Sequence, residues 1–468
     1  MENDFLSLMN EMDKGLCVDK NFDIIKRELI IGERRAILYF IDGFIKDEVF
    51  EKMLEYWFEQ TPEKLQGITD MERFSKNKMP YVEVSSTNDV NAAKIAVLSG
   101  PAVLIMEGIT GALIIDTRTY PSRSIQEPEK DKSLRGPRDG FVETLVMNTA
   151  MVRRRIRDER LRMEYFQIGK GTKLDVVISY IDGVADKKTL DIIRKKLKEI
   201  TINGISMTQQ ALCESLVKTS FFCPFPKFKF SERPDYTSAS ILEGKIAVIM
   251  DNSPSVMLLP TNLWDFFREA DDYYFLPLAG SYTRIIRILV IMITVVGTPI
   301  YLLAVNNPQY IPDWLQFIKP TVSGSIPLFV QFVILELIID GLRLASLNTP
   351  NTLSSSFGII GGLLLSEFAI NAGWLITEAI LLMAFVTIAS FSLPSFEMGY
   401  AMKFERLLLL ILSELFGLWG FIGGCIFIII AMFSVKTVTG KDYMYPIYPF
   451  NLKDFIRLFI RPSINKGE

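Results

Sequence analysis

The chain has 468 residues, a formal net charge of −3 at pH 7 and no histidine. The near-neutral charge gives no general attraction to nucleic acid, and the lack of histidine removes the commonest general base and metal ligand. Of the 105 acidic and basic residues, 84 lie in residues 1–287 and 12 in residues 288–433. A water-soluble region is therefore predicted to precede a region suited to a lipid bilayer.

The N-terminus and the cysteines restrict the compartment and the chemistry. Residues 1–20 are acidic and lack the apolar core of a signal peptide, which predicts that the soluble region stays in the cytoplasm. The four cysteines fit no metal-binding spacing and are expected to be reduced thiols. We expect no metal, no cofactor and no catalytic residue.

Two segments of the soluble region repeat one pattern. Residues 37–43 form a predicted buried strand that ends at Asp42, and residues 177–183 form another that ends at Asp182. A helical stretch follows each, and Lys-Ile-Ala-Val occurs at residues 94–97 and again at 245–248. The repeats predict two related strand–helix–strand modules in tandem. Asp42 and Asp182 are interpreted as residues that end a strand before a helix, with a catalytic role as the alternative. No glycine-rich phosphate loop follows either strand, so no nucleotide site is expected.

A long helix is predicted over residues 141–167, after a proline- and charge-rich link at residues 120–133. Its apolar residues fall on one stripe, and its arginines spread round the remaining surface between acidic residues. A nucleic-acid helix gathers its arginines on one face, so no nucleic-acid partner is expected. Ion pairs within or between subunits, or a solvated surface, are the alternatives. Asp139 is expected to cap this helix.

Five apolar stretches follow, over residues 288–305, 326–342, 357–370, 374–393 and 407–433. Arg284 and Arg287 precede the first, and the tail after residue 433 is basic, so both ends are predicted to be cytoplasmic. An odd number of membrane crossings, such as five, would leave the two ends on opposite sides of the membrane. We therefore expect the short stretch 357–370 to be re-entrant or interfacial.

Five acidic residues lie within or beside these apolar stretches, where a carboxylate that faces lipid is costly. They are expected either to line a cation path or to form internal salt bridges, such as a pair between Asp340 and Arg343. Gly420, Gly423 and Gly424 permit close helix contact, either between subunits or within one. The five acidic residues are Glu336, Asp340, Glu367, Glu378 and Glu414.

Residues 135–143, with Asn148 and residues 153–156 after them, resemble the signature of the GerA-type spore germination family. This family comprises the A subunits of nutrient germinant receptors and their relatives. The resemblance continues at residues 232–235, 253–256, 348–350 and 394–397. Residues 157–162 and 181–186 are most similar to one branch, the stage V sporulation proteins AF. The signature positions are Arg135, Gly136, Pro137, Arg138, Asp139, Gly140, Glu143, Asn148, Arg153, Arg154 and Arg155.

The resemblance implies a multi-pass protein of the inner spore membrane with a cytoplasmic two-part N-terminal region. It implies an oligomeric channel that conducts ions during germination, and a structural or oligomer-interface role for the signature residues. The implied partners are membrane lipid, further copies of the chain and other germination membrane proteins. A membrane-anchored scaffold or accessory protein that assembles with germinant receptors is the alternative. A membrane-bound enzyme is not expected, because the soluble part shows no clustered pair of carboxylates.

The predicted fold class is an α/β region of two related modules followed by an all-α polytopic membrane domain. The predicted domains are the N-terminal module over residues 1–133, the second module over 134–283, the membrane domain over 284–435 and a cytoplasmic tail over 436–468.

Overall fold

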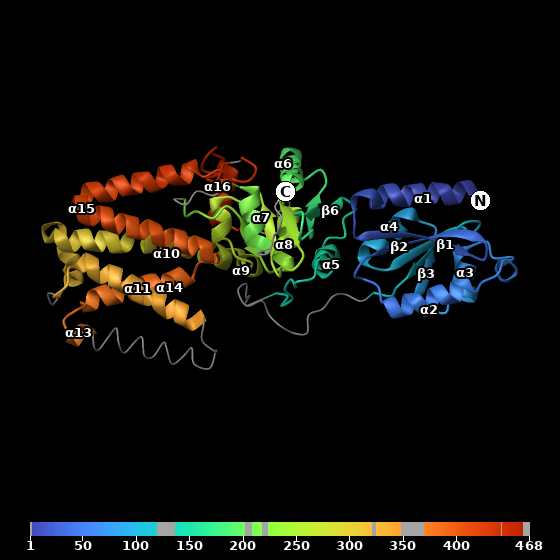
Figure 1. Cartoon of the computed structure of the whole chain (residues 1–468), viewed down its shortest axis with the longest axis horizontal. Coiled ribbons are helices and arrows are strands. Elements are labelled where there is room, and N and C mark those ends of the chain that lie inside the picture. Colours follow the sequence, from blue (N-terminus) through green and yellow to red (C-terminus); the bar gives the residue numbers. More distant parts are fainter. Residues whose placement is uncertain are drawn as a thin grey trace. The chain divides into compact units, whose positions relative to one another are not determined.

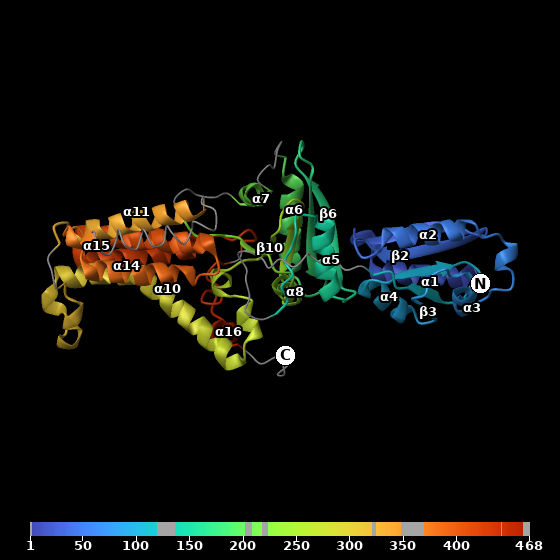
Figure 2. The ribbon, with the colours of Figure 1, turned by 90° about the horizontal axis from the view of Figure 1, so that it is seen from below.

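The computed structural model describes residues 2–118, 136–201, 208–217, 223–320, 324–347, 369–440 and 442–461. The chain divides into two compact units (Figures 1 and 2). The first comprises Met1–Lys218 and Phe228–Thr261, and the second comprises Thr219–Lys227 and Asn262–Glu468. Two five-stranded sheets lie in the first unit, and the described part of the second unit is helical. This confirms the predicted α/β region followed by a helical region.

The first sheet has the strand order β1-β2-β4-β5-β3, and all its pairs are antiparallel. Its strands are β1 (Ile24–Ile31), β2 (Arg34–Ile41), β3 (Val84–Thr87), β4 (Ala102–Met106) and β5 (Ala112–Ile115). The helices of this module are α1 (Glu2–Leu16), α2 (Asp47–Phe58), α3 (Met71–Lys78) and α4 (Val90–Ser99), with short 3-10 turns η1 (Val18–Lys20) and η2 (Glu63–Leu65).

Strand β2 is buried on both faces because helices cover both sides of this sheet. Ala36 and Leu38 belong to the core formed with α2 and α3, whereas Ile37 and Tyr39 belong to the core formed with α1 and α4. Figure 1 shows α1 and α2 on opposite sides of the strands. Successive side chains of a strand point to opposite faces, which explains why β2 is a continuous apolar run.

The second sheet repeats the first, with strand order β6-β7-β9-β10-β8. Asp42 follows the end of β2 and Asp182 follows the end of β7, and each precedes a glycine with φ of 80° or 84°. Glycine adopts this conformation without strain, so the repeated Asp-Gly pair is a turn. The strands are β6 (Leu161–Ile168), β7 (Leu174–Ile181), β8 (Lys229–Ser231), β9 (Ile246–Met250) and β10 (Val256–Leu259). The helices are α5 (Leu145–Arg155), α6 (Lys187–Glu199), α7 (Thr208–Leu216) and α8 (Pro234–Leu242).

One part of the predicted repeat is wrong. Residues 94–97 lie within helix α4, whereas residues 246–248 begin strand β9. The common sheet order makes β4 the counterpart of β9. Asp89 caps α4 by accepting a hydrogen bond from the backbone N–H of Asn91, and α4 ends before Gly100. These flanking residues, and not the four shared letters, decide the local structure.

The predicted helix over residues 141–167 is also wrong, because it combines a helix with a strand. Helix α5 ends at Arg155, a turn closed by the Asp158 carboxylate and the N–H of Arg160 follows, and β6 begins at Leu161. The helix also begins later than predicted, so Asp139 does not cap it. Instead the carboxylate of Asp251 accepts a hydrogen bond from the backbone N–H of Leu145, the first residue of the helix, at 3.0 Å.

A buried ion pair joins the two modules of the first unit. The Arg153 guanidinium on α5 donates to the Asp23 carboxylate at the start of β1 at 3.0 and 3.1 Å, and both side chains are at most 1% exposed. Beside it, the backbone N–H of Met163 donates to the Asn21 side chain at 2.7 Å. Two parallel hydrogen bonds fix the orientation of the pair as well as neutralising it.

The second unit begins with the 3-10 turn η3 (Leu263–Phe267) and helix α9 (Asp271–Tyr274). The long helices are α10 (Pro277–Asn306), α11 (Leu328–Leu347), α14 (Thr377–Phe391) and α15 (Phe396–Ser434), and the short elements are η4 (Pro308–Tyr310), η5 (Asp313–Ile318), α13 (Ala369–Asn371) and α16 (Leu452–Phe459). Within the described residues, α10 and α15 are long and apolar enough to cross a membrane. The predicted stretch 357–370 lies almost wholly outside the described residues.

Helix α15 consists of two arms that meet at Gly417, where φ is 61° and ψ is −141°. Figure 1 shows the two arms of α15 folding back on each other. A Cβ atom added at Gly424 on the second arm would lie only 2.7 Å from the Leu409 side chain on the first arm, and one added at Gly420 would clash with the Leu412 carbonyl. Two of the three predicted small residues therefore permit close contact within one chain.

We expect Arg153→Met to loosen the contact between the two modules. The substitution keeps most of the side-chain volume but leaves the Asp23 carboxylate buried without its cation, which costs about 3–5 kcal/mol. Native-state hydrogen exchange on the full chain measures the effect as faster exchange in β1 and β6.

Arg160→Met is the matched control, because Arg160 pairs with Asp158 at the surface and its side chain is 61% exposed. We expect this variant to exchange like the unchanged protein. Equal protection of β1 and β6 in both variants contradicts the role assigned to the Asp23–Arg153 pair.

Candidate functional sites

Four charged side chains of α11 and α15 form a compact group, called here the bundle charge cluster: Glu336, Asp340, Lys403 and Arg406. The Arg406 guanidinium lies 2.5 Å from the Glu336 carboxylate, and the Lys403 ammonium lies 3.3 Å from it. Lys403 also pairs with Asp340. Glu336 and Arg406 are each only 4% exposed. Two acids and two bases balance, so the cluster carries no net charge in an apolar surrounding.

The bundle charge cluster also reaches α10, since Arg406 donates to the backbone carbonyl of Thr294 at 3.4 Å. Three helices that are far apart in sequence therefore meet at one level. A guanidinium with five donors in a fixed plane suits such a junction better than an ammonium does.

The structure brings together only two of the five acids that the sequence singled out. Glu336 and Asp340 share the bundle charge cluster, Glu378 is half-buried in the first turn of α14, and Glu414 is exposed on the first arm of α15. Glu367 lies outside the described residues. Arg343 lies over the rings of Phe396 and Tyr400, with centroid distances of 5.0 and 5.8 Å.

The sequence reasoning missed Lys403 and Arg406. The last apolar stretch was predicted to begin at residue 407, but α15 begins at Phe396, where the Ser395 hydroxyl accepts the N–H of Met398. The sequence did contain one signal, which is spacing. Lys403 and Arg406 are three residues apart, and Glu336 and Asp340 are four residues apart. Either spacing places two side chains on one face of a helix.

The basic residues before the first apolar stretch are also paired. Arg287 donates to Asp272 at 3.0 Å and to Glu269 at 2.5 Å, and Arg284 lies 3.5 Å from Asp272. Asp272 is fully buried. These pairs fasten the start of α10 to the segment directly before it.

The family signature positions lie among contacts that connect distant parts of the second module. The Asn148 side chain exchanges two hydrogen bonds with the backbone of Val142 and donates a third to the carbonyl of Ser253. The N–H of Phe141 donates to the carbonyl of Glu232 at 2.8 Å. Arg233 donates to the carbonyl of Pro137 at 3.3 Å. Three of the motifs, at residues 135–148, 232–235 and 253–256, thus meet in one place, called here the signature cluster.

The charged signature residues have varied surroundings. Asp139 pairs with Arg155 at 2.5 Å, and Arg153 pairs with Asp23 of the first module. Arg138, Glu143 and Arg154 are exposed, as is Gly136, whereas Gly140 is buried. Arg135 lies outside the described residues.

The shifted pKa values of Glu164 and Tyr180 belong to one hydrogen-bonded network with Arg194. Burial raises the pKa of the Glu164 carboxyl, but hydrogen bonds from Arg194 and Tyr180 outweigh burial and hold that pKa below its usual value. Burial and the hydrogen bond to Glu164 raise the pKa of Tyr180. Each shifted group has a structural partner, so these shifts do not mark a reactive site.

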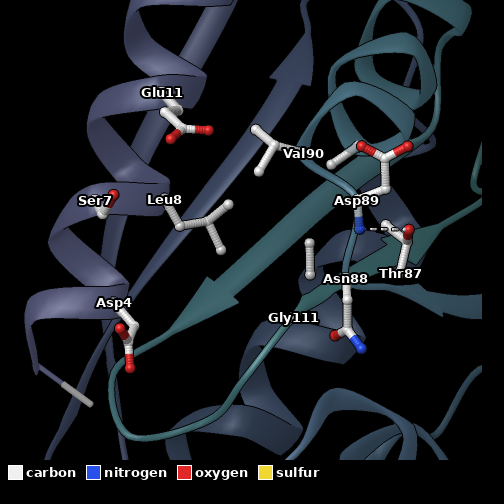
Figure 3. Close-up of a pocket in the computed structure, with 11 residues that line it drawn as sticks. Asp4, Ser7, Leu8, Glu11, Thr87, Asn88, Asp89, Val90 and Gly111 are labelled. Carbon is white, nitrogen blue, oxygen red and sulfur yellow. Dashed lines mark hydrogen bonds between the residues drawn. The ribbon is translucent and has the colours of Figure 1, made fainter.

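A pocket of about 240 Å³ opens between α1, the β3–α4 turn and β5. Figure 3 shows Asp4 and Glu11 on α1 across from Asn88 and Asp89, with Leu8 pointing towards Val90. Asp89 is occupied as the cap of α4. The acidic lining favours cations over anions. Within the described ranges, no group of three or more Cys, Asp or Glu residues is arranged to hold a metal ion.

Residues 13–468 match the family model described as Bacillus/Clostridium GerA spore germination protein. The chain is 34% identical over 448 residues to stage V sporulation protein AF of Bacillus subtilis (strain 168), covering 95% of this chain and 89% of the relative. It is 30% identical over 441 residues to spore germination protein KA of the same organism, covering 93% and 80%.

One solved structure is similar over the N-terminal half. The N-terminal domain of the A subunit of the Bacillus megaterium spore germinant receptor GerK3 is 27% identical, with a TM-score of 0.42. The match covers 54% of this chain and 92% of that chain.

We expect Glu336→Leu to destabilise the helical unit by roughly 2–5 kcal/mol, because Arg406 then stays buried without its carboxylate. Thermal unfolding of the purified full chain in detergent measures the loss. The double variant Glu336→Leu/Arg406→Leu removes both charges and should recover much of the stability. Glu414→Leu is the control, since this carboxylate is exposed and should leave the melting temperature unchanged. A normal melting temperature for Glu336→Leu contradicts the assigned role.

Proposed function

Because the chain belongs to the GerA family of spore germination proteins, we propose that it is a subunit of an oligomeric ion-conducting channel that releases ions during germination. The proposed location is the inner spore membrane, with several crossings and with the two α/β modules in the cytoplasm. The role in germination follows from the family. The channel, the oligomer and the location are supported by the features below.

Exposed apolar side chains support insertion of the helical unit into a bilayer. Leu289 and Met292 on α10 are 51% and 60% exposed, an arrangement that water disfavours. Helix α10 has 30 residues, which at the helical rise span about 45 Å, more than the hydrocarbon thickness of about 30 Å. Beyond its end, Tyr310, Trp314 and Phe317 are at least 75% exposed, as aromatic side chains at a membrane interface are.

The exposure of the Glu414 side chain on an apolar helix surface is the single observation that carries the channel proposal. It is exposed on the first arm of α15, between Ile411 and Leu415, which are 45% and 67% exposed. An ionised carboxylate on an apolar outer face is costly in lipid. Water or another subunit must therefore reach it, and a ring of such carboxylates round a shared axis attracts cations.

The bundle charge cluster is assigned a different role. Its acids are paired within one chain, so Glu336 and Asp340 fasten helices together instead of lining the path. The cytoplasmic modules reach the pore through the segment 271–287, whose charged residues are paired around Asp272.

A membrane-anchored scaffold that assembles with germinant receptors is the second candidate. The pairing of Glu336 and Asp340 within one chain favours it, because these paired carboxylates need no water-filled path. The two candidates differ in what Glu414 does: it controls current in a channel, and it contacts a neighbouring protein in a scaffold.

We expect Glu414→Gln to lower cation conductance of the purified full chain in planar bilayers by about threefold or more at low ionic strength. The substitution removes one charge per subunit and keeps the shape. Current–voltage curves at low and high salt measure the effect, which should shrink as salt screens the carboxylates.

Glu397→Gln is the matched control on the same helix. Glu397 lies in the first turn of α15 and accepts a hydrogen bond from Ser395, far from Glu414 along the helix. Equal conductance in both variants removes Glu414 from the path. Absence of current from the unchanged protein, in reconstituted oligomers and at all ion gradients tried, favours the scaffold.

A further inference from the structure

Helix α16 in the C-terminal tail has an exposed apolar stripe. Leu452 and Ile456, with Ile460 directly after the helix, are 60%, 45% and 54% exposed. At about 100° per residue these three fall within one 80° sector. On another side of the helix, Leu458 is buried against the protein with 5% exposure. The helix therefore has more apolar surface than its packing uses.

Basic residues border this stripe on one side. Lys453 and Arg457 follow it round the helix at the next positions, and both are exposed. Arg457 lies 3.6 Å from Asp454, which leaves the helix with one net positive charge. Before the helix, Tyr448 and Phe450 are 60% and 65% exposed. An apolar stripe with basic residues beside it and aromatic residues at its end is typical of a helix that lies in a membrane interface.

The helix is fixed at the place where such an interface is expected. The backbone N–H of Arg461 donates to the Ser281 hydroxyl at 3.0 Å, and Arg284 donates to the carbonyl of Arg457 at 3.3 Å. Figure 2 shows α16 beside the start of α10. In the same first turns of α10, Leu278 and Tyr282 are 84% and 65% exposed. The exposed stripe of α16 is thus attached to the exposed apolar surface of the helix that enters the bilayer.

We propose that α16 is an interfacial helix, whose stripe of Leu452, Ile456 and Ile460 lies at the headgroup–acyl boundary of anionic lipid on the side where α10 enters. Lys453 and Arg457 then face lipid phosphates. This inference rests on the proposed function, in that α10 and α15 cross the bilayer. It places part of the cytoplasmic tail expected from the sequence at the membrane surface, next to the Asp272 contacts at the start of α10.

Charge favours lipid over a second copy of the chain as the partner. A stripe buried between two copies needs acidic or neutral residues opposite Lys453 and Arg457, whereas an anionic bilayer supplies phosphates along the whole helix. The affinity for an anionic surface grows by about fivefold for each basic residue. The stripe alone is short, so its contact with α10 supplies the rest of the attachment.

Depth-dependent quenching tests the proposal in the full chain, with Cys17, Cys213, Cys223 and Cys425 replaced by serine. Ile456→Cys is labelled with an environment-sensitive fluorophore and the protein is reconstituted into vesicles of phosphatidylglycerol and phosphatidylcholine. We expect quenching by lipids with a nitroxide near the headgroup to exceed quenching by a deep nitroxide about twofold or more. Protection from aqueous iodide should weaken several-fold in the Lys453→Gln/Arg457→Gln background or in phosphatidylcholine alone.

Two further labelled positions separate the possible outcomes. Ile293→Cys in the middle of α10 should be quenched by the deep nitroxide, and Lys195→Cys on the exposed face of α6 by iodide alone. Quenching at residue 293 with full iodide access at residue 456 overturns the interfacial helix and leaves the proposed function standing. Protection at residue 456 without lipid quenching assigns the stripe to a protein partner instead. Absence of lipid quenching at residue 293 overturns both proposals.

Discussion

The helical unit depends on one constraint: a charge in an apolar surrounding must be paired or reached by water, since an unpaired buried ion costs several kcal/mol. Glu336 and Arg406 meet this constraint at the level of Thr294, and Asp272 meets it with two arginines at the start of α10. Apolar contact alone gives lipid-embedded helices little preference for one neighbour, because lipid tails are equally apolar. The ion pairs therefore decide which helices are neighbours and at which height they meet.

The same constraint organises the soluble unit. Arg153 and Asp23 come from different modules and neutralise each other in the interior, so neither module can release the other without exposing a buried charge. In the signature cluster, the neutral Asn148 side chain satisfies the backbone of a loop that no strand pairs. A polar contact of this kind requires particular side chains, whereas an apolar contact can be made by many different side chains. This explains in physical terms why particular signature residues, such as Asn148 and Arg153, hold distant segments together.

The sequence was sufficient for features that depend on local pattern, and insufficient for those that depend on distant partners. The two related modules followed from the repeated strand that ends in Asp-Gly, and the helical region from its lack of charge. The sequence did not separate α5 from β6, because the apolar spacing across Ile156 suits a helix until the turn at Asp158 interrupts it. It also could not pair Glu336 with Arg406, 70 residues away. The spacing of the bases signals that an acidic partner exists, but it does not say which distant residue supplies it.

The first arm of α15 carries both a residue of the bundle charge cluster, Arg406, and Glu414, which is proposed to line the conduction path. Arg406 and Glu414 lie eight residues apart on it, which corresponds to about 12 Å along the axis and about 80° round it. Because Arg406 is held by Glu336 and by the carbonyl of Thr294, the rotation of this arm about its own axis is fixed. Turning Glu414 inward would move Arg406 out of its pairs, at a cost of several kcal/mol. The pairing of Arg406 with Glu336 and the outward direction of the Glu414 carboxylate are thus two consequences of one helix orientation. A substitution that breaks the Arg406–Glu336 pair is therefore expected to change the direction of Glu414 as well.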